Sequence, residues 1–435
     1  MIKRRDFIKL LSSAGVGMTA AGWSGFAAAD KRRTTSAAAA VVPTIAGVKG
    51  RVVVIGGGMG GATVAKYLRM WGGTGVDVTL VEREPVYTSN IMSNLVLNGQ
   101  RTVQSLQYGY GNLANKYGIR MMQGNVVAID PVGRKITLAD GTLLAYDKLV
   151  LSPGIDFETV PGLETAEAQA KVPHAWKAGQ QTTALRNMIA AMPNNGAFVM
   201  SIPAAPYRCP PGPYERACVV ADWLRRNKPG ARVIVLDANP KIMAEPNAFL
   251  EGFALHGIQY YTNAVIDHVD TGSMSVYTNL GRVDANVINV IPPQRAGAVI
   301  TDNGLADVGG RWTGVNVLTY EANHIAGVHV IGDASATTQP KAGHIANQEA
   351  KVCADAMVRA FAGKNPDPSP VTNSSCYSPI TADTASWLTA VFGFDAATGT
   401  MKVVGGAATE AASRSKDNYE EMLKWFNTLM SDSFA

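Results

Sequence analysis

The sequence predicts an α/β protein in which parallel strands alternate with helices. Residues 51–82 hold an apolar run that stops at glycines, then a helical pattern, then a second apolar run that ends on Glu82. The order of strand, helix and strand recurs over residues 197–237, and residues 328–334 form an apolar strand that ends in Gly-Asp. These three stretches predict two Rossmann-like domains, the first of them discontinuous in sequence.

The glycine-rich turn in the first stretch predicts a site for the ADP half of a dinucleotide. Gly56 permits the turn, Gly58 lets the backbone approach a pyrophosphate, and Gly61 lets the helix pack on the strand. The helix N-terminus offers free N–H groups to the phosphates, and Glu82 is placed to accept hydrogen bonds from a ribose. The alternative, a glycine turn without a ligand, is disfavoured because strand, glycines, helix, strand and acid occur together.

The chain after Glu82 completes the first part of this domain. The patterns predict a helix, a strand at a second edge of the nucleotide pocket, a hairpin around Asp140-Gly141 and a buried strand with a glycine turn. These elements cover residues 108–117, 119–130, 134–144 and 148–154. A domain boundary is expected near Pro161-Gly162.

The second part of the domain returns with the strand that ends in Gly332-Asp333. It is similar to the second FAD-contacting motif of the glutathione-reductase-like family, in which the Asp binds ribityl or phosphate hydroxyl groups; the alternative is an ordinary strand end. A helix predicted over residues 345–361 would place a partial positive charge near the flavin's pyrimidine ring. His344, at its start, is expected to make local hydrogen bonds rather than to take part in catalysis.

The middle segment has the strands of a second nucleotide fold without its glycine turn. Strands are predicted over residues 197–202 and 232–237, with a helix from about Glu215 to Arg226. Where a pyrophosphate would need bare backbone, residues 203–214 form a proline-rich loop with bulky side chains. We therefore expect this half to keep the scaffold and to lack the ligand chemistry of an NADH site.

Residues 1–29 predict an export signal of the twin-arginine type. A basic head holds the pair Arg4-Arg5, a mildly apolar middle follows, and residues 27–29 are alanines. The alternative, a membrane anchor, is disfavoured because serines and glycines interrupt the apolar middle. The expected location is the periplasm, with residues 30–49 as a loose lead-in.

Charge and composition indicate a soluble protein of two or three domains. Residues 1–29 hold four of the 39 basic and one of the 34 acidic side chains, which leaves 35 and 33 and a net charge of +2. So small a balance gives no long-range field for nucleic acid or an anionic membrane. The hydrophobic content of 47% is enough for a large core.

The four cysteines divide into two kinds of environment. Cys218 and Cys353 lie in helical patterns among apolar neighbours, which favours buried and inert thiols. Cys209 lies among prolines and Cys376 among serines, both in predicted loops. No pair has the C-x-x-C spacing of a metal site, so no metal is expected.

Three motifs carry a resemblance to a known family. CPPGPYERAC after a strand, VYTSNIMSN near the first nucleotide motif and NSSCYS near the end resemble the flavoprotein subunit of flavocytochrome c sulfide dehydrogenase. The resemblance covers nearly the whole exported chain. It implies an α/β fold with two Rossmann-like, glutathione-reductase-like domains and a C-terminal α+β interface domain. It also implies FAD, sulfide oxidation through a redox-active disulfide, and a c-type cytochrome as electron acceptor.

The resemblance also assigns roles to individual residues. The disulfide pair corresponds to Cys209 and Cys376, and Glu215 corresponds to a carboxylate near the active site, although a carboxylate at a helix start can equally be a cap. The family commonly attaches FAD through a cysteine three residues before a Ser-Asn pair, a position held here by Asn90. FAD is therefore expected to bind without a covalent link at this position.

The predicted cofactor residues and domains complete this interpretation. The residues expected to contact FAD are Gly56, Gly58, Gly60, Gly61, Glu82, Arg83, Asn90, Val126, Ser152, Gly154, Gly332, Asp333, Lys341 and Gly343. The expected domains are an FAD-binding domain over 50–165 and 285–365, a second nucleotide-type domain over 166–284, and a C-terminal domain over 366–435.

The resemblance predicts that hydrosulfide attacks one sulfur of the Cys209–Cys376 bridge and leaves a persulfide and a thiolate. The haem would belong to a separate subunit, because this sequence has no C-x-x-C-H motif. Two alternatives stay open at this point: a membrane-associated sulfide:quinone oxidoreductase, and a redox-inert flavin-binding accessory protein of a sulfur-oxidation complex.

Overall fold

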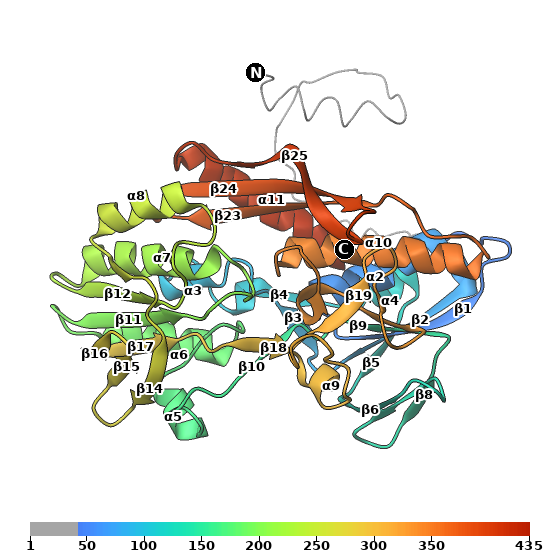
Figure 1. The fold of residues 1–435 in the computed structure, drawn as a ribbon, viewed down its shortest axis with the longest axis horizontal. Helices are drawn as coiled ribbons and strands as arrows, with labels where there is room; N and C mark the ends of the chain where they lie inside the picture. Colours follow the sequence, from blue (N-terminus) through green and yellow to red (C-terminus); the bar gives the residue numbers. More distant parts are fainter. Residues whose placement is uncertain (1–41) are drawn as a thin grey trace, which may run out of the picture. The chain divides into compact units, whose positions relative to one another are not determined.

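An eight-stranded sheet forms the centre of the first domain in the computed structural model, which describes residues 42–435 (Figure 1). The order of its strands is β22-β19-β20-β21-β9-β1-β2-β5. Their bounds are β1 Gly50–Ile55, β2 Val76–Glu82, β5 Arg120–Gln123, β9 Lys148–Leu151, β19 Thr313–Asn316, β20 Glu321–Ala322, β21 Val328–Val330 and β22 Ser335–Ala336. The predicted export signal at residues 1–29 lies outside the described residues.

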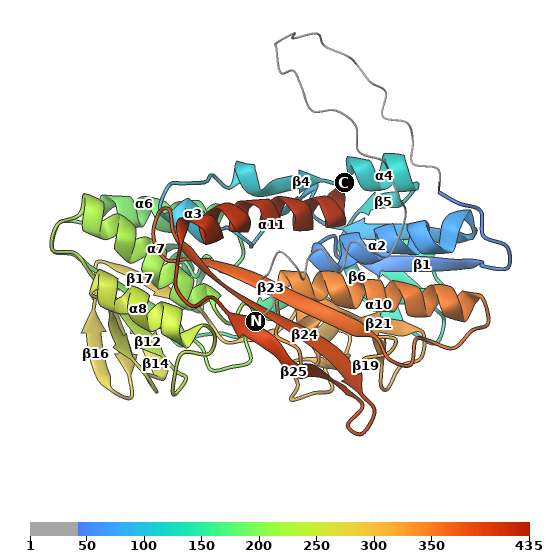
Figure 2. The same cartoon turned by 90° about the horizontal axis from the view of Figure 1, so that it is seen from above.

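Parallel pairing brings two distant stretches of the chain to one edge of this sheet. β1 pairs with β2 on one side and with β9 on the other, and β9 pairs in turn with β21. The carboxyl ends of parallel strands meet at the same sheet edge, so the turn after β1 lies near the Gly-Asp turn after β21. Helices α2 (Met59–Gly72) and α10 (Gly343–Phe361) pack against each other (Figure 2).

Smaller elements complete the first domain. A three-stranded antiparallel sheet contains β6 (Val126–Asp130), β7 (Lys135–Leu138) and β8 (Leu143–Ala145) and includes the predicted hairpin. The helix predicted over residues 108–117 begins only at Gly111, as α4 (Gly111–Tyr117). Its first residues are instead in β4 (Gln107–Gly109), where Tyr108 pairs with Tyr87 of β3 (Val86–Thr88). Cross-strand pairing of two tyrosines therefore overrides the local helical pattern.

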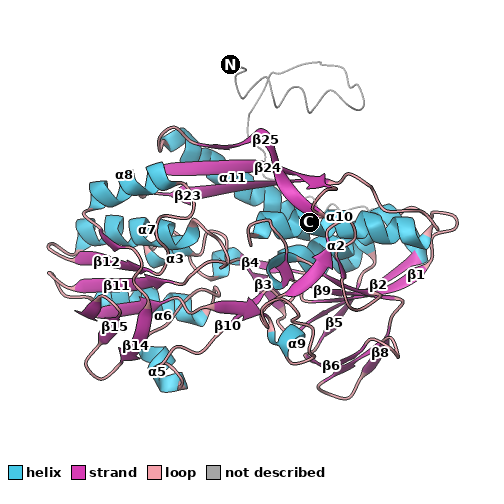
Figure 3. Ribbon diagram, in the orientation of Figure 1, coloured by secondary structure: helices cyan, strands magenta, loops and turns pink. Residues whose placement is uncertain are grey.

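The second domain contains a four-stranded parallel sheet of order β13-β12-β11-β17. The strands are β11 (Ala197–Ile202), β12 (Arg232–Asp237), β13 (Gln259–Tyr261) and β17 (Val287–Val290), with the small antiparallel sheet β14 (Ile266–Asp270), β15 (Ser275–Thr278) and β16 (Gly281–Asp284). The helices are α5 (Ala166–Lys171), α6 (Gln180–Ala191), α7 (Gly212–Asn227) and α8 (Pro246–His256) (Figure 3). The two predicted strands of this domain are confirmed residue for residue.

Short elements connect the two domains. β10 (Ile155–Phe157) and β18 (Gln294–Ala296) pair antiparallel where the chain crosses from one domain to the other. The remaining short helices are α3 (Asn94–Leu97), α9 (Ala298–Thr301), η1 (Gly73–Gly75), η2 (Gln104–Leu106) and η3 (Gly332–Ala334).

The C-terminal region is a three-stranded antiparallel sheet with one long helix. The sheet contains β23 (Val371–Pro379), β24 (Ala385–Asp395) and β25 (Thr400–Glu410), and the helix is α11 (Lys416–Phe434). β23 contacts α10 of the first domain and α7 of the second, so this region bridges the two. The architecture confirms the predicted α/β fold with two Rossmann-like domains and a C-terminal α+β part.

The described part of the predicted lead-in, residues 42–49, is more ordered than the sequence predicts. Residues 42–49 contain no helix or strand, but Val48 is buried and the carbonyl of Pro43 accepts a hydrogen bond from the Thr74 N–H at 2.8 Å. Van der Waals contact and one backbone hydrogen bond thus hold this segment against the end of α2. Within residues 42–435, no helix is both long and apolar enough to cross a membrane.

Candidate functional site

A cavity of about 1270 Å³ lies where both Rossmann-like domains and β23 contribute side chains. We call it the central cavity. Its lining residues come from within the stretches 55–60, 81–94, 103–110, 124–127, 152–156, 174–183, 208–215, 297–303, 332–346 and 375–379, together with Trp425. It therefore joins the glycine turn after β1, the proline-rich loop after β11 and the cysteine of β23 in one space.

The glycine turn leaves bare backbone on the cavity wall. Gly56 has a φ of 95°, and a Cβ there would lie 2.4 Å from the carbonyl oxygen of Ser152, so only glycine fits. At Gly58, a Cβ would meet nothing closer than the Tyr87 ring at 3.8 Å, which leaves the backbone open. No side chain caps the start of α2, so its first N–H groups are available to phosphate oxygens.

Glu82 and Gly61 support this turn in different ways. The Glu82 carboxylate borders the cavity and accepts hydrogen bonds from the Gly57 N–H at 2.5 Å and the Glu84 N–H at 2.9 Å. Gly61 does not line the cavity. A Cβ at this position would lie 1.7 Å from the Gly56 carbonyl oxygen, so Gly61 is needed for the close packing of α2 on β1.

Asp333 contributes a half-buried carboxyl group with a buried Oδ1 atom, at the turn after β21. Its Oδ1 atom has no hydrogen-bond partner among the described residues, and burial raises its pKa against the lowering effect of Arg208 and Lys341. The preceding Gly332 donates its N–H to Glu349 Oε2 at 2.6 Å, which holds the turn in place. A buried acceptor without a partner indicates a place for a ligand hydroxyl group.

Lys341 is placed differently from the prediction. It does not line the central cavity, because its Nζ donates to the carbonyl oxygens of Asp333 and Ser335, each at 2.8 Å, and lies 3.8 Å from the centre of the Trp312 ring. Burial lowers the pKa of Lys341 to about 8. Lys341 thus braces the turn that carries Asp333.

Twelve of the fourteen residues predicted to contact the cofactor line the central cavity. They are Gly56, Gly58, Gly60, Glu82, Arg83, Asn90, Val126, Ser152, Gly154, Gly332, Asp333 and Gly343. The other two, Gly61 and Lys341, do not line the cavity. Gly61 allows the close packing of α2 on β1, and Lys341 holds the Asp333 turn through hydrogen bonds.

Cys209 and Cys376 lie in the same cavity, although 167 positions separate them in the sequence. All four cysteines are free thiols in this structure, and the disulfide that the resemblance implies stays a prediction. Cys376 lies in strand β23 and not in the loop that the sequence predicts, because its segment pairs with β24. Burial raises the pKa of Cys209 well above its ordinary value, with a further rise from Cys376, and it raises the pKa of Cys376 to about 12. Cys218 and Cys353 are fully buried, as predicted.

Glu215 is a buried acid on the first turn of α7, and it lines the cavity close to Cys209 in sequence. Its Oε1 accepts a hydrogen bond from Asn94 Nδ2 at 2.9 Å. Burial raises the pKa of Glu215 to about 8, against the lowering effect of that hydrogen bond. The side chain therefore keeps a proton near neutral pH, which suits a proton donor better than a helix cap.

His344 and Asn90 each hold a loop against the cavity wall. His344 Nδ1 accepts a hydrogen bond from the Ser375 N–H at 2.9 Å, next to Cys376. Burial lowers the pKa of His344, so the ring is neutral. Asn90 Oδ1 accepts from the Ala178 N–H at 2.7 Å. The predicted local hydrogen bonding of His344 is wrong: its partner is Ser375, 31 positions away in β23, because the C-terminal sheet packs against the start of α10.

In the second domain, the position that corresponds to Glu82 is occupied by Asp237, whose carboxylate is hydrogen-bonded to other protein side chains. Asp237 ends β12 and is fully buried, and its Oδ2 accepts hydrogen bonds from the hydroxyl groups of Tyr214 and Tyr260, each at 2.8 Å. Asn239 donates its backbone N–H and its side-chain amide to Oδ1, at 2.9 and 2.7 Å. No lone pair of this acid is left for a ribose.

Family comparisons match these regions one by one. Residues 182–292 match the central domain of the sulfide dehydrogenase [flavocytochrome c] flavoprotein chain, and residues 368–434 match the flavin-binding domain of flavocytochrome c sulphide dehydrogenase. Residues 50–188 match pyridine nucleotide-disulphide oxidoreductases. The chain carries the central and flavin-binding domains of the flavocytochrome c sulfide dehydrogenase flavoprotein family. This family consists of oxidoreductases.

Curated relatives share shorter stretches with this flavocytochrome c-type flavoprotein. Ferroptosis suppressor protein 1 of Taeniopygia guttata is 34% identical over 108 residues, and the probable ferredoxin reductase CtmF of Castellaniella defragrans is 36% identical over 107. These matches cover 24% of this chain and 27% and 26% of the relatives, so the chain spans about a quarter of their length. A mitochondrial sulfide:quinone oxidoreductase of Dictyostelium discoideum is 22% identical over 303 residues, 66% of this chain and 65% of that protein.

Solved structures share the fold over most of the chain. The sulfide:quinone oxidoreductase of Aquifex aeolicus superimposes with a TM-score of 0.72 at 18% identity, over 88% of this chain and 91% of that one. An NAD-dependent persulfide reductase from A. fulgidus has a TM-score of 0.59 at 15% identity, over 78% and 64% of the two chains.

The residues of the flavoprotein fit FAD. The open backbone at Gly58, the uncapped start of α2 and the unpartnered Asp333 Oδ1 supply what a pyrophosphate and a polyhydroxyl chain require. Glu82 borders the same cavity and is free to bind a ribose with its remaining lone pairs. The site is large enough for a dinucleotide.

Sequence reasoning missed two groups that build the site. Arg216 is almost fully buried and donates to Asn94 Oδ1, to Asn289 Oδ1 and to the carbonyl oxygen of His174, all at 2.9 Å. Burial lowers its pKa to about 9. The second group is Glu245, a buried acid outside every motif. For Arg216, the available signal was an arginine inside an apolar helix pattern. For Glu245, the sequence offered no signal.

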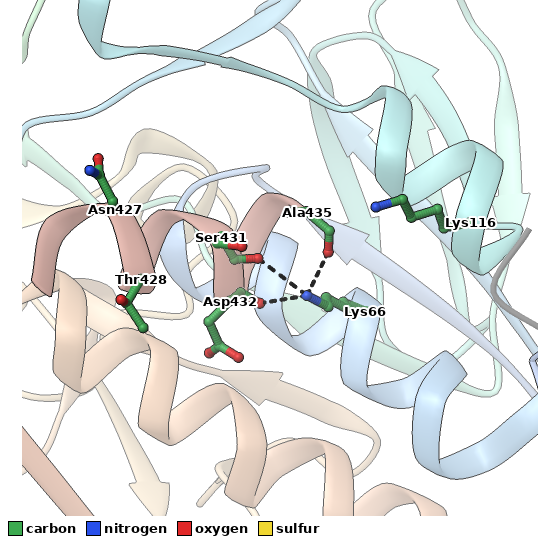
Figure 4. Close-up of a pocket in the computed structure, with 7 residues that line it drawn as sticks. All are labelled: Lys66, Lys116, Asn427, Thr428, Ser431, Asp432 and Ala435. Atoms are coloured by element: carbon green, nitrogen blue, oxygen red, sulfur yellow. Dashed lines mark hydrogen bonds between the residues drawn. The ribbon is translucent and has the colours of Figure 1, made fainter. Parts of the chain in front are cut away.

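A second hollow shares no residue with the central cavity and has a structural explanation. It lies at the end of α11, where Lys66 donates to the carbonyl oxygens of Ser431, Asp432 and Ala435 at 3.4, 3.0 and 2.7 Å (Figure 4). A lysine at the carbonyl end of a helix complements the helix dipole. This contact fixes α11 on α2.

Proposed function

We propose that this protein is an exported, FAD-dependent enzyme that oxidises sulfide through Cys209 and Cys376 and passes the electrons to a c-type cytochrome. One observation carries the proposal: two cysteines from different domains line the same cavity as the residues that fit FAD. The matches to two domains of the flavocytochrome c sulfide dehydrogenase family support the substrate and the acceptor.

The chemistry begins with the oxidised form of the two cysteines. Hydrosulfide attacks one sulfur of the bridge, so that a new S–S bond forms in a persulfide while the old bond breaks and leaves a thiolate on the other cysteine. Overall, hydrosulfide loses two electrons and one proton to become sulfur. Bound FAD supplies a two-electron acceptor that can release electrons singly to a haem.

The protein supplies the electrostatics and the proton handling. The start of α7 carries partial positive charge next to Cys209, which favours the approach of an anion and stabilises a thiolate. Glu215 has a pKa of about 8. Its protonated form can give a proton to a thiolate, and its ionised form can accept one from hydrogen sulfide. Asn94 orients this carboxyl group through its hydrogen bond.

Two further features of the proposal rest on the sequence. The absence of a C-x-x-C-H attachment motif from the sequence supports a haem that is carried by a partner, and the twin-arginine pattern at residues 1–29 supports a periplasmic location. FAD is held without a covalent link at residue 90, because Asn90 has no thiol and its Oδ1 is engaged by the Ala178 N–H. Acid precipitation should release all the yellow colour, and flavin on the washed pellet would contradict this point.

Anaerobic addition of sulfide tests the proposal. The flavin absorbance should bleach rapidly, and a c-type cytochrome should then recover it. Cys209→Ser and Cys376→Ser should each abolish bleaching while FAD stays bound, whereas Cys218→Ser and Cys353→Ser should bleach like the parent. A parent protein that binds FAD but does not bleach is an accessory protein, and recovery by a soluble quinone alone indicates a different acceptor.

A further inference from the structure

A second buried carboxyl group lies behind the cavity wall. Glu245 is 2% exposed and does not line the central cavity. It occupies the N-cap position of α8 with a φ of 51°, in the left-handed region that is unfavourable for a residue with a Cβ. The Glu245 side chain makes no capping hydrogen bond to α8, so helix capping does not account for a buried acid at this position.

The contacts of Glu245 leave its carboxyl group half satisfied. Ser378 Oγ donates to Glu245 Oε2 at 2.5 Å. Glu245 Oε1 is buried and has no hydrogen bond of good geometry among the described residues, although the buried Ser386 hydroxyl of β24 is near enough to lower the pKa of Glu245. An ionised carboxylate in such a place lacks solvation on one oxygen, so the group binds a proton more readily than an exposed glutamate does.

Ser378 connects Glu245 to the reactive strand. Cys376 and Ser378 are two residues apart in β23, so their side chains lie on the same face of the strand. Helix α7, which carries Glu215 and Cys218, packs on both α8 and β23. A Cβ at Gly252 of α8 would lie 2.9 Å from Cys218 Sγ, which shows how closely these layers approach. Glu245 is therefore joined to the strand that carries Cys376 by the hydrogen bond from Ser378.

We propose that Glu245 is a positioning residue that exchanges charge with the Cys376 thiol: it takes up a proton when Cys376 loses one. In this step an O–H bond forms at Glu245 as the S–H bond of Cys376 breaks, so the number of buried negative charges does not rise. The inference rests on the proposed function, which gives Cys376 its role in the reaction.

The groups that face Glu245 agree with this exchange. They are Glu215 and Cys218 on α7, Cys376 on β23 and Glu410 on β25. All are acids, and none supplies a positive charge. Burial raises the pKa of Glu245 to about 7, and after burial Glu245 is the largest contribution that raises the pKa of Cys376. By reciprocity, a thiolate at Cys376 raises the pKa of Glu245 in turn.

The test measures the pKa of Cys376 directly. In full-length, FAD-bound protein with Cys209→Ser, Cys218→Ser and Cys353→Ser, Cys376 is the single thiol, and its alkylation rate by iodoacetamide is followed against pH. Glu245→Gln should lower the pKa of Cys376 by about one unit, so alkylation at about pH 9 should be about tenfold faster. Glu251→Gln on the same helix, whose side chain is half exposed and pairs with Arg414, should leave the profile unchanged.

A second variant keeps the test decisive if Glu245→Gln folds poorly. Ser378→Ala removes a hydrogen bond that favours the carboxylate, so it should shift the Cys376 profile in the same direction by a smaller amount. Unchanged profiles in the folded variants would show that Glu245 is only structural and would overturn the inference. Alkylation needs neither sulfide nor turnover. If the flavin of the parent protein does not bleach with sulfide, the proposed function is wrong, but the measured pKa shift of Cys376 remains valid.

Discussion

The two Rossmann-like domains share the order of four parallel strands, β5-β2-β1-β9 in the first and β13-β12-β11-β17 in the second, and differ at the end of their second strand. Glu82 ends β2 and Asp237 ends β12, each on a strand that pairs in parallel with the first strand of its domain. Glu82 borders the central cavity, whereas Asp237 is fully buried under hydrogen bonds from Tyr214, Tyr260 and Asn239. The same scaffold therefore supports a nucleotide site in one domain and a packed core in the other.

The difference originates in the turn after the first strand. β1 is followed by glycines that leave backbone exposed to the cavity. β11 is followed by the loop that contains Tyr207 and leads to Tyr214, and both tyrosines are buried. Aromatic rings there occupy the volume that a pyrophosphate would need. Topology alone thus does not determine ligand binding, and side chains at the first turn decide it.

Overpacking the first turn should have the largest effect. Gly61→Val places a branched side chain where even a Cβ would lie 1.7 Å from the Gly56 carbonyl oxygen, so α2 must move away from β1. We expect loss of bound FAD and a fall of about 3 kcal/mol or more in the free energy of unfolding, measured by urea denaturation. Gly111→Ala is the matched control, because a Cβ there meets no atom within 4 Å. A Gly61→Val protein that retains FAD would contradict the packing argument.

The filled second domain should exclude nicotinamide nucleotides. NADH and NADPH should not reduce the flavin at a useful rate in anaerobic stopped-flow measurements, because Asp237 has no free lone pair and tyrosines occupy the first turn. Sulfide serves as the positive control in the same instrument. Fast reduction by NADH would show that the two domains are functionally alike.

A pair of isosteric changes should separate the two acids. Glu82→Gln should weaken FAD binding about tenfold, a change of about 1.4 kcal/mol, and leave the melting temperature nearly unchanged. Asp237→Asn should leave FAD binding unchanged and lower the free energy of unfolding by about 2 kcal/mol, because buried hydroxyl donors lose their acceptor. Fluorescence titration and thermal melting measure the two effects, and an exchange of the two outcomes would reverse the assignment.

A further expected effect is the pH dependence of stability that Glu215 confers where the two domains meet. Its pKa is about 8 in the folded chain and lower in the unfolded chain, so the folded state binds the extra proton. This stabilisation is complete below the unfolded pKa of about 4.3 and is lost as the pH rises through 8. Glu215→Gln should reduce the loss of stability between about pH 6 and 9 by on the order of 2 kcal/mol. An identical slope in urea denaturation would show that Glu215 does not carry this proton.

Local patterns predicted most elements correctly where side-chain periodicity and glycine geometry act alone. The strands at residues 197–202 and 232–237 match β11 and β12 residue for residue. Prediction failed where a distant partner decided the outcome. Tyr108 pairs with Tyr87 instead of starting a helix, Val48 is buried in a segment expected to be loose, and Lys341 turns away from the cavity to hold the Asp333 turn.

The sequence by itself determined the order of strand, glycine turn, helix and acid around Gly56 and Glu82, because glycine conformation and hydrophobic periodicity act over a few residues. Its motifs also pointed to the family, and through it to Cys209 and Cys376. Only the tertiary structure decided that these two thiols share a cavity, that Asp237 is saturated while Asp333 is not, and that Glu245 is buried behind β23. Burial and hydrogen-bond satisfaction depend on residues far apart in the chain, so no local pattern carries them.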